Sequence, residues 1–83
     1  MKFLTMLLIS VGSVFAAVDL NTASEKELTS LHGIGNKKAK DILNYRKENC
    51  FKTINDLSNI KGIGKKTVAK NEADLIVSTC TNN

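Results

Sequence analysis

Leu31-His32-Gly33-Ile34-Gly35 returns later in the chain as Ile60-Lys61-Gly62-Ile63-Gly64. Each copy consists of an apolar residue, a residue able to carry positive charge, and the triplet Gly-Ile-Gly. A lysine pair follows each copy, Lys37-Lys38 after the first and Lys65-Lys66 after the second. Because the flanking residues recur with the phrase, it is an internal repeat and not two chance matches. Four of the five glycines of the chain belong to the two copies, so the fold is organised around them.

The repeat extends upstream into a shared helix start. Ser24-Glu25-Lys26-Glu27 and Thr53-Ile54-Asn55-Asp56 both match the capping box, in which the side chains at the two ends bond each other's backbone N–H groups. Each box is followed by two apolar residues three apart, which lie on one face of a short helix. These residues are Leu28 with Leu31, and Leu57 with Ile60.

A second helix is expected after each glycine phrase, from Asn36 to about Glu48 and from Lys65 to about Val77. Asn71 departs from the repeat because it occupies the position of Ile42 in the first copy. Phe51, between the halves, is expected to fill the core. The residues expected on the apolar faces of the two helices are Ala39, Ile42 and Leu43, and Val68, Ala69, Ala73 and Ile76. The sequence therefore predicts an all-α fold of four main helices, in two halves packed about a pseudo-two-fold axis.

Residues 1–16 have the pattern of a signal peptide. Met1-Lys2 is positive, and the apolar stretch after it leads to the small-x-small triplet Val14-Phe15-Ala16. The alternative is an uncleaved membrane anchor, but the stretch is shorter than the about 20 residues that a spanning helix needs. We therefore expect a mature domain of residues 17–83 that is exported from the cytoplasm and is not inserted in the membrane after cleavage.

Export changes how the two cysteines are interpreted. Cys50 and Cys80 form an even count in an oxidising compartment, and a bridge between them closes a loop of about 30 residues, worth roughly 3–4 kcal/mol. The alternative is two separate small apolar thiols, and the disulfide is favoured. Two thiols and the single histidine are too few for a zinc site, so no metal site is predicted.

The glycine phrases are the candidate binding sites. A helix start leaves its first backbone N–H groups without partners, and it carries partial positive charge. Glycines such as Gly33 and Gly35 permit positive φ angles and leave no side chain in the way of an oxygen atom, while Ile34 is expected to point inward. Lysines at such a helix start are unfavourable for the helix dipole unless an external anion compensates. The alternative is a tight turn beside solvated lysines, but two copies in the same context favour an anion site.

Two anion sites at a fixed separation suit a polymer with regularly spaced phosphates. Double-stranded DNA, bound through its backbone and with little sequence preference, is the expected ligand. The formal net charge of +4 is modest and becomes informative only because lysines cluster at the repeat.

The pattern Leu31-x-Gly33-Ile34-Gly35-x-x-x-Ala39-x-x-Ile42 resembles the helix-hairpin-helix DNA-binding motif, as does its copy from Ile60. Residues 18–77 resemble the ComEA family of competence proteins in the order and spacing of Val18–Ala23, Tyr45-Arg46 and Phe51–Thr53. The resemblance implies a tandem helix-hairpin-helix domain, with motifs at about 24–48 and 53–78. It also implies a periplasmic, non-sequence-specific DNA-binding protein that receives and retains incoming DNA during natural transformation.

The resemblance further implies which residues bind and what they meet. DNA is gripped by hairpin backbone amides in the family, and a monovalent cation is sometimes held by hairpin carbonyls in related proteins. No other cofactor is expected, and proteins of the DNA-uptake machinery are expected partners. The implied DNA-binding residues are Gly33, Ile34, Gly35, Lys37, Lys38, Gly62, Ile63, Gly64, Lys65 and Lys66.

The chain departs from the family pattern at two positions. His32 stands where the family usually has proline, and an exposed turn residue is favoured over a phosphate contact. Cys50 stands near a position where the family often carries glycine, which indicates a disulfide particular to this chain. Tyr45 and Phe51 are expected in the core, since neither belongs to a basic–aromatic array that would stack on bases.

No catalytic arrangement is evident in the sequence. The eight acidic residues are dispersed, and one histidine leaves little acid–base chemistry, so the chain is not expected to be an enzyme. Two alternatives to the DNA receptor stay open. The chain is then either an accessory DNA-binding module of a secreted nuclease or repair-type system, or a helical protein-interaction module in which the hairpins serve packing only.

Overall fold

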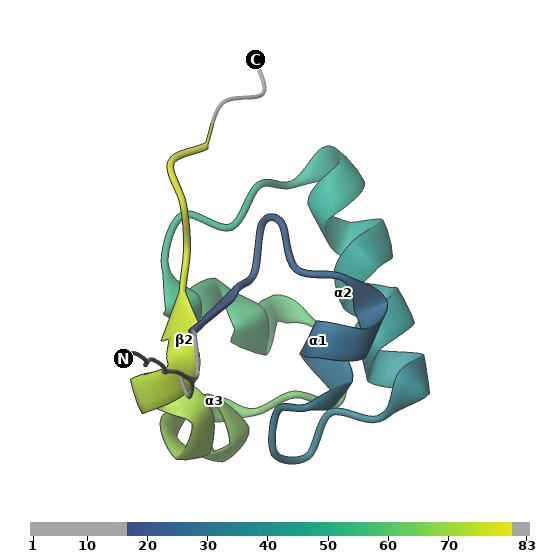
Figure 1. Cartoon of the computed structure of the whole chain (residues 1–83), viewed down its shortest axis with the longest axis vertical. Helices are drawn as coiled ribbons and strands as arrows, with labels where there is room; N and C mark the ends of the chain where they lie inside the picture. The colour runs from purple at the N-terminus through teal and green to yellow at the C-terminus, as the bar shows by residue number, and fades with distance from the viewer. Residues whose placement is uncertain (1–16, 81–83) are drawn as a thin grey trace, which may run out of the picture.

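Two helix pairs make up most of the computed structural model, which describes residues 17–80 (Figure 1). The elements of the two pairs are α1 (Glu25–Thr29) with α2 (Asn36–Glu48), and η2 (Ile54–Asn59) with α3 (Lys65–Asn71). In each pair the two helices pack against one another across a short hairpin. The four predicted main helices are therefore present. The predicted signal peptide, residues 1–16, lies outside the described residues.

Each pair begins at the predicted capping box. Ser24 Oγ accepts a hydrogen bond from the Glu27 N–H at 3.1 Å, and the Glu27 carboxylate accepts from the Ser24 N–H at 2.8 Å. In the second pair, the Asp56 carboxylate accepts from the backbone N–H groups of Thr53 and Lys52 at 3.2 and 2.9 Å. The segment that follows, η2, is a 3₁₀-helix and not an α-helix, so the two halves differ in detail while sharing a start.

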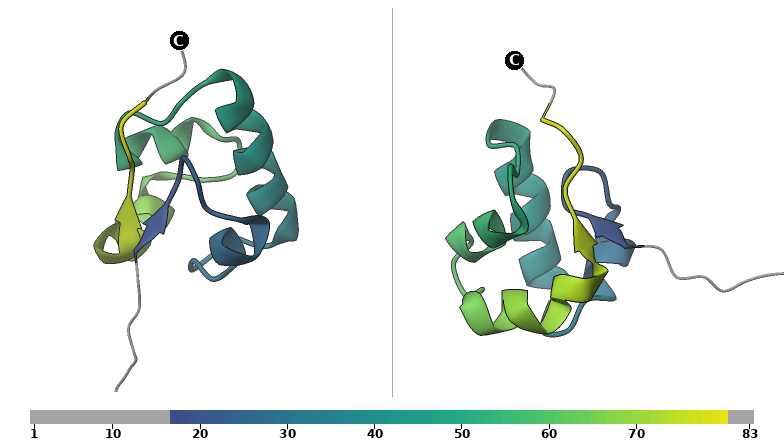
Figure 2. Two further views of the ribbon diagram at one scale, coloured as in Figure 1. Left: turned by 45° about the horizontal axis from the view of Figure 1, so that its top comes forward. Right: turned by 90° about the vertical axis from the view of Figure 1, so that its left-hand side faces the viewer.

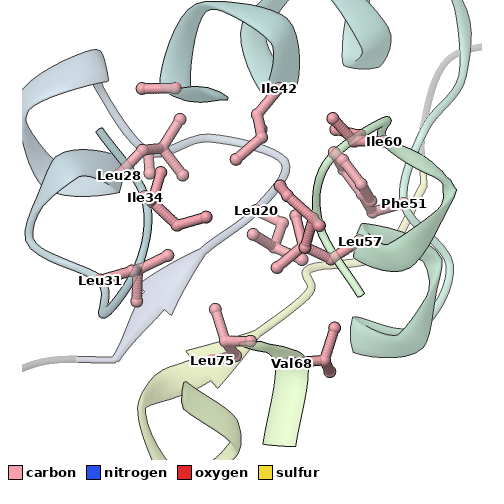
Figure 3. Close-up of a cluster of buried hydrophobic side chains, with 13 residues drawn as sticks. Leu20, Leu28, Leu31, Ile34, Ile42, Phe51, Leu57, Ile60, Val68 and Leu75 are labelled. Carbon is pink, nitrogen blue, oxygen red and sulfur yellow. The ribbon is translucent and has the colours of Figure 1, made fainter. Parts of the chain in front are cut away.

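Apolar side chains from both halves meet in one core (Figure 3). Phe51 is fully buried, as predicted, and its ring lies 4.9 Å from that of Tyr45 between centroids. The core prediction for these two aromatic residues is thus confirmed. Ala39 and Ile42 of α2 are buried, and Leu43 packs against the core from a partly exposed position. Because one apolar core contains residues of both halves, the two halves form one domain.

The last helix is shorter than predicted. α3 ends at Asn71 and is followed by the 3₁₀-helix η3 (Glu72–Asp74) and the strand β2 (Leu75–Ile76). β2 pairs in parallel with β1 (Val18–Asp19), and Figure 2 shows the two strands side by side. The prediction of a helix to Val77 was wrong because this pairing supplies backbone partners that the local sequence pattern does not reveal.

The apolar face predicted for the last helix is also mostly wrong. Val68 is buried, but Ala69 and Ala73 are exposed and Ile76 is 49% exposed. Leu75 enters the core instead, at 6% exposure. Once the helix ends at Asn71, the helical spacing no longer determines which side chains face inward.

The disulfide predicted between Cys50 and Cys80 is present, with the two Cα atoms 5.7 Å apart. Beside it, the Asn21 side chain donates to the carbonyls of Phe51 and Ser78 at 2.9 and 3.0 Å and accepts from the Phe51 N–H at 2.8 Å. The beginning, the middle and the end of the described chain are therefore joined at one place, at the end of α2 away from the hairpins.

Asp19 completes this junction. Its carboxylate accepts from the backbone N–H groups of Asn21 at 2.9 Å and Ser78 at 3.1 Å. Partial burial raises the pKa of the Asp19 carboxyl, but these bonds and those from the hydroxyls of Ser78 and Thr22 outweigh it, so the pKa lies below its usual value. The charged form is thus the one that holds β1 to the C-terminal segment.

Candidate nucleic-acid interface

The two glycine phrases form adjacent hairpins at one end of the domain, the lower end in Figure 1. We call residues 31–35 hairpin 1 and residues 60–64 hairpin 2. A Cβ atom on Gly33 would lie 3.6 Å from Thr67 Cγ2 in the first turn of α3, and one on Gly62 would lie 3.3 Å from Lys38 Cε in the first turn of α2. Thr67 and Lys38 occupy the same position in the two repeats. Each hairpin therefore packs on the helix start of the other, as a pseudo-two-fold arrangement requires.

Both hairpins are closed by the same turn. The N–H of the fourth residue donates to the carbonyl of the first, Ile34 to Leu31 at 3.2 Å and Ile63 to Ile60 at 3.0 Å. The third residue has a positive φ, 78° at Gly33 and 91° at Gly62, which is what a type II turn requires of that position. The two isoleucines, Ile34 and Ile63, are 3% exposed, and the inward orientation predicted for Ile34 is thus found in both hairpins. Their side chains are therefore turned away from any ligand, and their N–H groups are used in closing the turns.

The second glycine of each hairpin behaves differently from the first. Gly35 and Gly64 have φ values of −93° and −102°, which any residue adopts, so the expectation of a positive φ at Gly35 was wrong. A Cβ atom on either residue would meet nothing within 4 Å. Neither the backbone conformation nor packing among the described residues calls for glycine here. What glycine alone supplies is bare backbone that a large ligand can approach closely.

The helices after the hairpins start without the capping boxes that begin α1 and η2. α2 and α3 begin at Gly35 and Gly64 with no side-chain cap and no acidic residue in the first turn, whereas α1 has both. Ala39 and Val68 are the first residues whose N–H groups bond within these two helices. The earlier amides have no intrahelical acceptor. Among residues 17–80, the two helix starts next to the hairpins are thus the ones that lack both a side-chain cap and an acidic residue in the first turn.

The predicted lysines are arranged unequally around the hairpins. Lys37, Lys65 and Lys66 are exposed, while Lys38 is half-buried with its stem against Gly62. Lys37 Nζ lies 3.0 Å from the Asp41 carboxylate one turn later in α2. Within residues 17–80, Lys65 and Lys66 form no salt bridge. The second hairpin therefore presents more uncompensated positive charge.

Asn71 has a role at this end of the domain that the sequence did not reveal. Its side chain is 1% exposed and forms hydrogen bonds with both the N–H and the carbonyl of His32 in hairpin 1. The sequence marked Asn71 only as a departure from the repeat, because its partner lies 39 positions away. The His32 side chain is exposed, which agrees with its interpretation as a turn residue.

The described residues limit what else this surface can hold. No group of three or more His, Cys, Asp or Glu side chains lies together within residues 17–80. A monovalent cation would therefore rest on main-chain carbonyls, and of these Leu31, His32 and Ile60 already accept hydrogen bonds. The cation stays a prediction. In the same part of the chain, no helix has the length and apolar character needed to cross a membrane.

Comparison with known proteins agrees with the geometry. A family model described as the helix-hairpin-helix motif matches residues 14–76. ComE operon protein 1 of Bacillus subtilis is 41% identical over 69 residues, which are 82% of this chain and 34% of that protein. An uncharacterized protein of Haemophilus influenzae is 43% identical over 61 residues, 71% of this chain and 54% of its own length.

Similarity also reaches into much larger proteins of a different kind. The kinesin-like protein KIF22 of Xenopus tropicalis is 52% identical over 50 residues, 59% of this chain but 8% of that protein. The chain thus spans about a third of the Bacillus relative and less than a tenth of the kinesin-like one. What is shared with these relatives is the hairpin domain and not the architecture of the whole proteins.

Proposed function

This chain is a ComEA-like protein that belongs to the helix-hairpin-helix family, and on that premise we propose that it binds double-stranded DNA through the backbone phosphates. The observation that carries the proposal is the pair Gly35 and Gly64. Both are glycines that nothing within the described residues requires, and both stand at an open, uncapped helix start. A phosphate oxygen placed there accepts hydrogen bonds from amides that have no other partner.

The paired phosphate sites suit a polymer with regularly spaced phosphates, and double-stranded DNA is the polymer we propose. Hairpin 1 and hairpin 2 lie side by side in one domain, and each contacts the helix start of the other. A single small anion would use one site, whereas a nucleic-acid backbone presents phosphates to both. Contacts confined to phosphates carry no direct sequence information, so binding is expected to be insensitive to sequence.

The biological setting follows from the same resemblance. We propose that the chain works in the periplasm, where it receives and retains incoming DNA during natural transformation, together with proteins of the DNA-uptake machinery. The predicted signal peptide at residues 1–16 would deliver it there. Many copies that bind each segment as it enters would prevent backsliding. Deletion of the gene should stop DNA from accumulating in the periplasm, and normal accumulation without it would refute this role.

Direct binding is tested by titrating the purified protein with random-sequence duplex DNA over a salt series. Each neutralised phosphate contributes about 0.9 to the log–log slope of affinity against salt concentration. Gly35→Ala and Gly64→Ala should each lower the affinity and the slope, because the added methyl group stands where the phosphate approaches. Both variants should remain folded, since their φ values suit alanine.

A lysine far from the hairpins serves as a control for nonspecific electrostatic attraction between the protein and DNA. Lys47 is exposed in the last turn of α2, at the opposite end of the helix from hairpin 1. Lys47→Ala should leave the slope unchanged. A flat salt response of the unmodified protein would refute DNA binding and favour a protein-interaction module. Unchanged binding by both glycine variants would refute the close approach of phosphate to the backbone.

A further inference from the structure

Asn71 is the one polar side chain that is buried among residues 17–80. Its amide is fully used: Oδ1 accepts from the His32 N–H at 2.8 Å, and Nδ2 donates to the carbonyls of His32 and Thr67, both at 2.9 Å. A buried amide without these partners would be costly, so the three bonds hold one another in place.

These bonds join the two halves of the candidate interface. His32 is the second residue of hairpin 1, whereas Asn71 and Thr67 belong to α3, which begins directly after hairpin 2. The two bonds to His32 run in opposite directions between one side chain and one residue. Such a pair fixes orientation as well as distance, because hydrogen bonds weaken steeply away from linear geometry.

Among the described residues, the first repeat has no residue that is equivalent to Asn71 and bonds the backbone of hairpin 2. Ile42 occupies the position of Asn71 in the first repeat, and it is fully buried among apolar side chains. An apolar contact gives no directional bond to the backbone of Lys61, the counterpart of His32. Within residues 17–80, hairpin 1 is therefore held to the second half by hydrogen bonds to its own backbone, whereas residues 60–64 of hairpin 2 form none with the first half; the nearest one joins Asn59 Nδ2 to Tyr45 Oη at 3.1 Å, one residue before hairpin 2.

We propose that Asn71 is a positioning residue that sets hairpin 1 at the place where it and hairpin 2 engage the same duplex. Asn71 touches no DNA in this arrangement and acts through the backbone of His32. This inference rests on the proposed function, because it assigns a role within the DNA-binding surface. Without Asn71 the domain keeps its fold, hairpin 2 still binds, and hairpin 1 no longer reaches its phosphate.

The test is a double-mutant cycle that combines lysine variants with a variant of Asn71. The measured quantity is the salt slope, which is the log–log slope of DNA affinity against salt concentration. Lys37→Ala and Lys66→Ala change equivalent positions of the two repeats, and in the unmodified protein each should lower the slope by about 0.9. In an Asn71→Leu background, Lys37→Ala should have no further effect, while Lys66→Ala should still lower the slope by about 0.9. In the same variant, the His32 amide should lose its protection from hydrogen exchange.

Val68→Ala is the matched control, since it removes packing from the same helix without touching the three hydrogen bonds. In that background both lysine variants should keep their full effects. If Asn71→Leu does not fold, Asn71→Asp takes its place, because it keeps the acceptor for His32 and loses both donated bonds. A Lys37→Ala effect that persists in the Asn71 variant overturns the inference and leaves DNA binding intact. A flat salt response of the unmodified protein overturns the proposed function itself.

Discussion

Hairpin 1 and hairpin 2 share a backbone and differ in the side chains around it. Both close with the same turn bond, both have one glycine with positive φ, and both open onto an uncapped helix. Hairpin 1 is fixed by Asn71, and its Lys37 is paired with Asp41. Hairpin 2 has no such pairing among the described residues, and Lys70 stands at the position equivalent to Asp41.

This difference between the hairpins shows that the repeated residues determine the backbone shape of each site. They do not determine how tightly each site binds DNA. The turn bond and the glycines are the same in both copies, so each copy offers the same set of amides. Charge and positioning are weighted toward different copies: within residues 17–80, both lysines after hairpin 2 are without a salt bridge, whereas Lys37 after hairpin 1 is paired and hairpin 1 has the hydrogen bonds to Asn71. The following predictions test this division, beginning with the largest expected effect.

The comparison of the two hairpins assumes that both are supported by the same domain core. The disulfide between Cys50 and Cys80 is the covalent crosslink of that domain. Replacement of Cys50 and Cys80 by serine should lower the free energy of unfolding by about 3–4 kcal/mol, because the bond closes a loop of about 30 residues. Chemical denaturation measures the change. DNA affinity should be kept wherever the variant is still folded, and a selective loss at one hairpin would show that the domain core is not shared.

Both positive-φ glycines should contribute to the stability of the fold. Gly33→Ala and Gly62→Ala each place a side chain in the left-handed region, which costs about 1–2 kcal/mol. The loss should be somewhat larger for Gly62, where the new methyl group meets Lys38 at 3.3 Å. Thermal unfolding measures both. Gly64→Ala is the control with negative φ, and a loss of stability there as large as at Gly62 would contradict the assignment of roles.

The lysine pairs should differ in their effect on affinity. Replacement of Lys65 and Lys66 by alanine should lower the salt slope by about 1.8, the value for two lost phosphate contacts. Replacement of Lys37 and Lys38 should weaken binding less at every salt concentration. Lys37 must leave Asp41 to reach a phosphate, and an exposed helical pair of this kind is worth about 0.3–0.5 kcal/mol. Equal losses for the two pairs would remove the distinction in charge between the hairpins.

The smallest effect should come from releasing Lys37. Asp41→Asn should raise DNA affinity about twofold, the equivalent of 0.3–0.5 kcal/mol for the broken pair. Glu25→Gln is the matched control, since it removes the same charge from the other salt bridge of the described residues, with Lys40 at 3.2 Å, and leaves the Lys37–Asp41 pair in place. A gain of the same size in both variants would show that only net charge matters.

The sequence predicted the parts of this structure that local chemistry decides. The capping box at Ser24, the helix from Asn36 to Glu48 and the inward isoleucines all follow from residues within a few positions of one another. The disulfide and the buried Phe51 were also predicted, from compartment and composition. The helix starts and the hairpins are repeated or self-contained, which is why a single sequence is enough to find them.

What the sequence did not reveal depends on contacts between distant residues. The end of α3 at Asn71 depends on pairing between β1 and β2, more than fifty positions apart. The role of Asn71 depends on a backbone partner in the other half, and a backbone group leaves no mark on the sequence. The negative φ of Gly35 shows a third limit, because a glycine can serve an external partner as well as its own turn.

The most direct test follows the backbone amides of an isotope-labelled protein during titration with a random-sequence duplex. The account predicts that amide resonances of Gly33–Gly35 and Gly62–Gly64 shift together and saturate at the same DNA concentration. Resonances around the Cys50–Cys80 disulfide should stay in place. Shifts confined to one hairpin, or centred on the disulfide end of the domain, would contradict the claim that two hairpins grip one duplex.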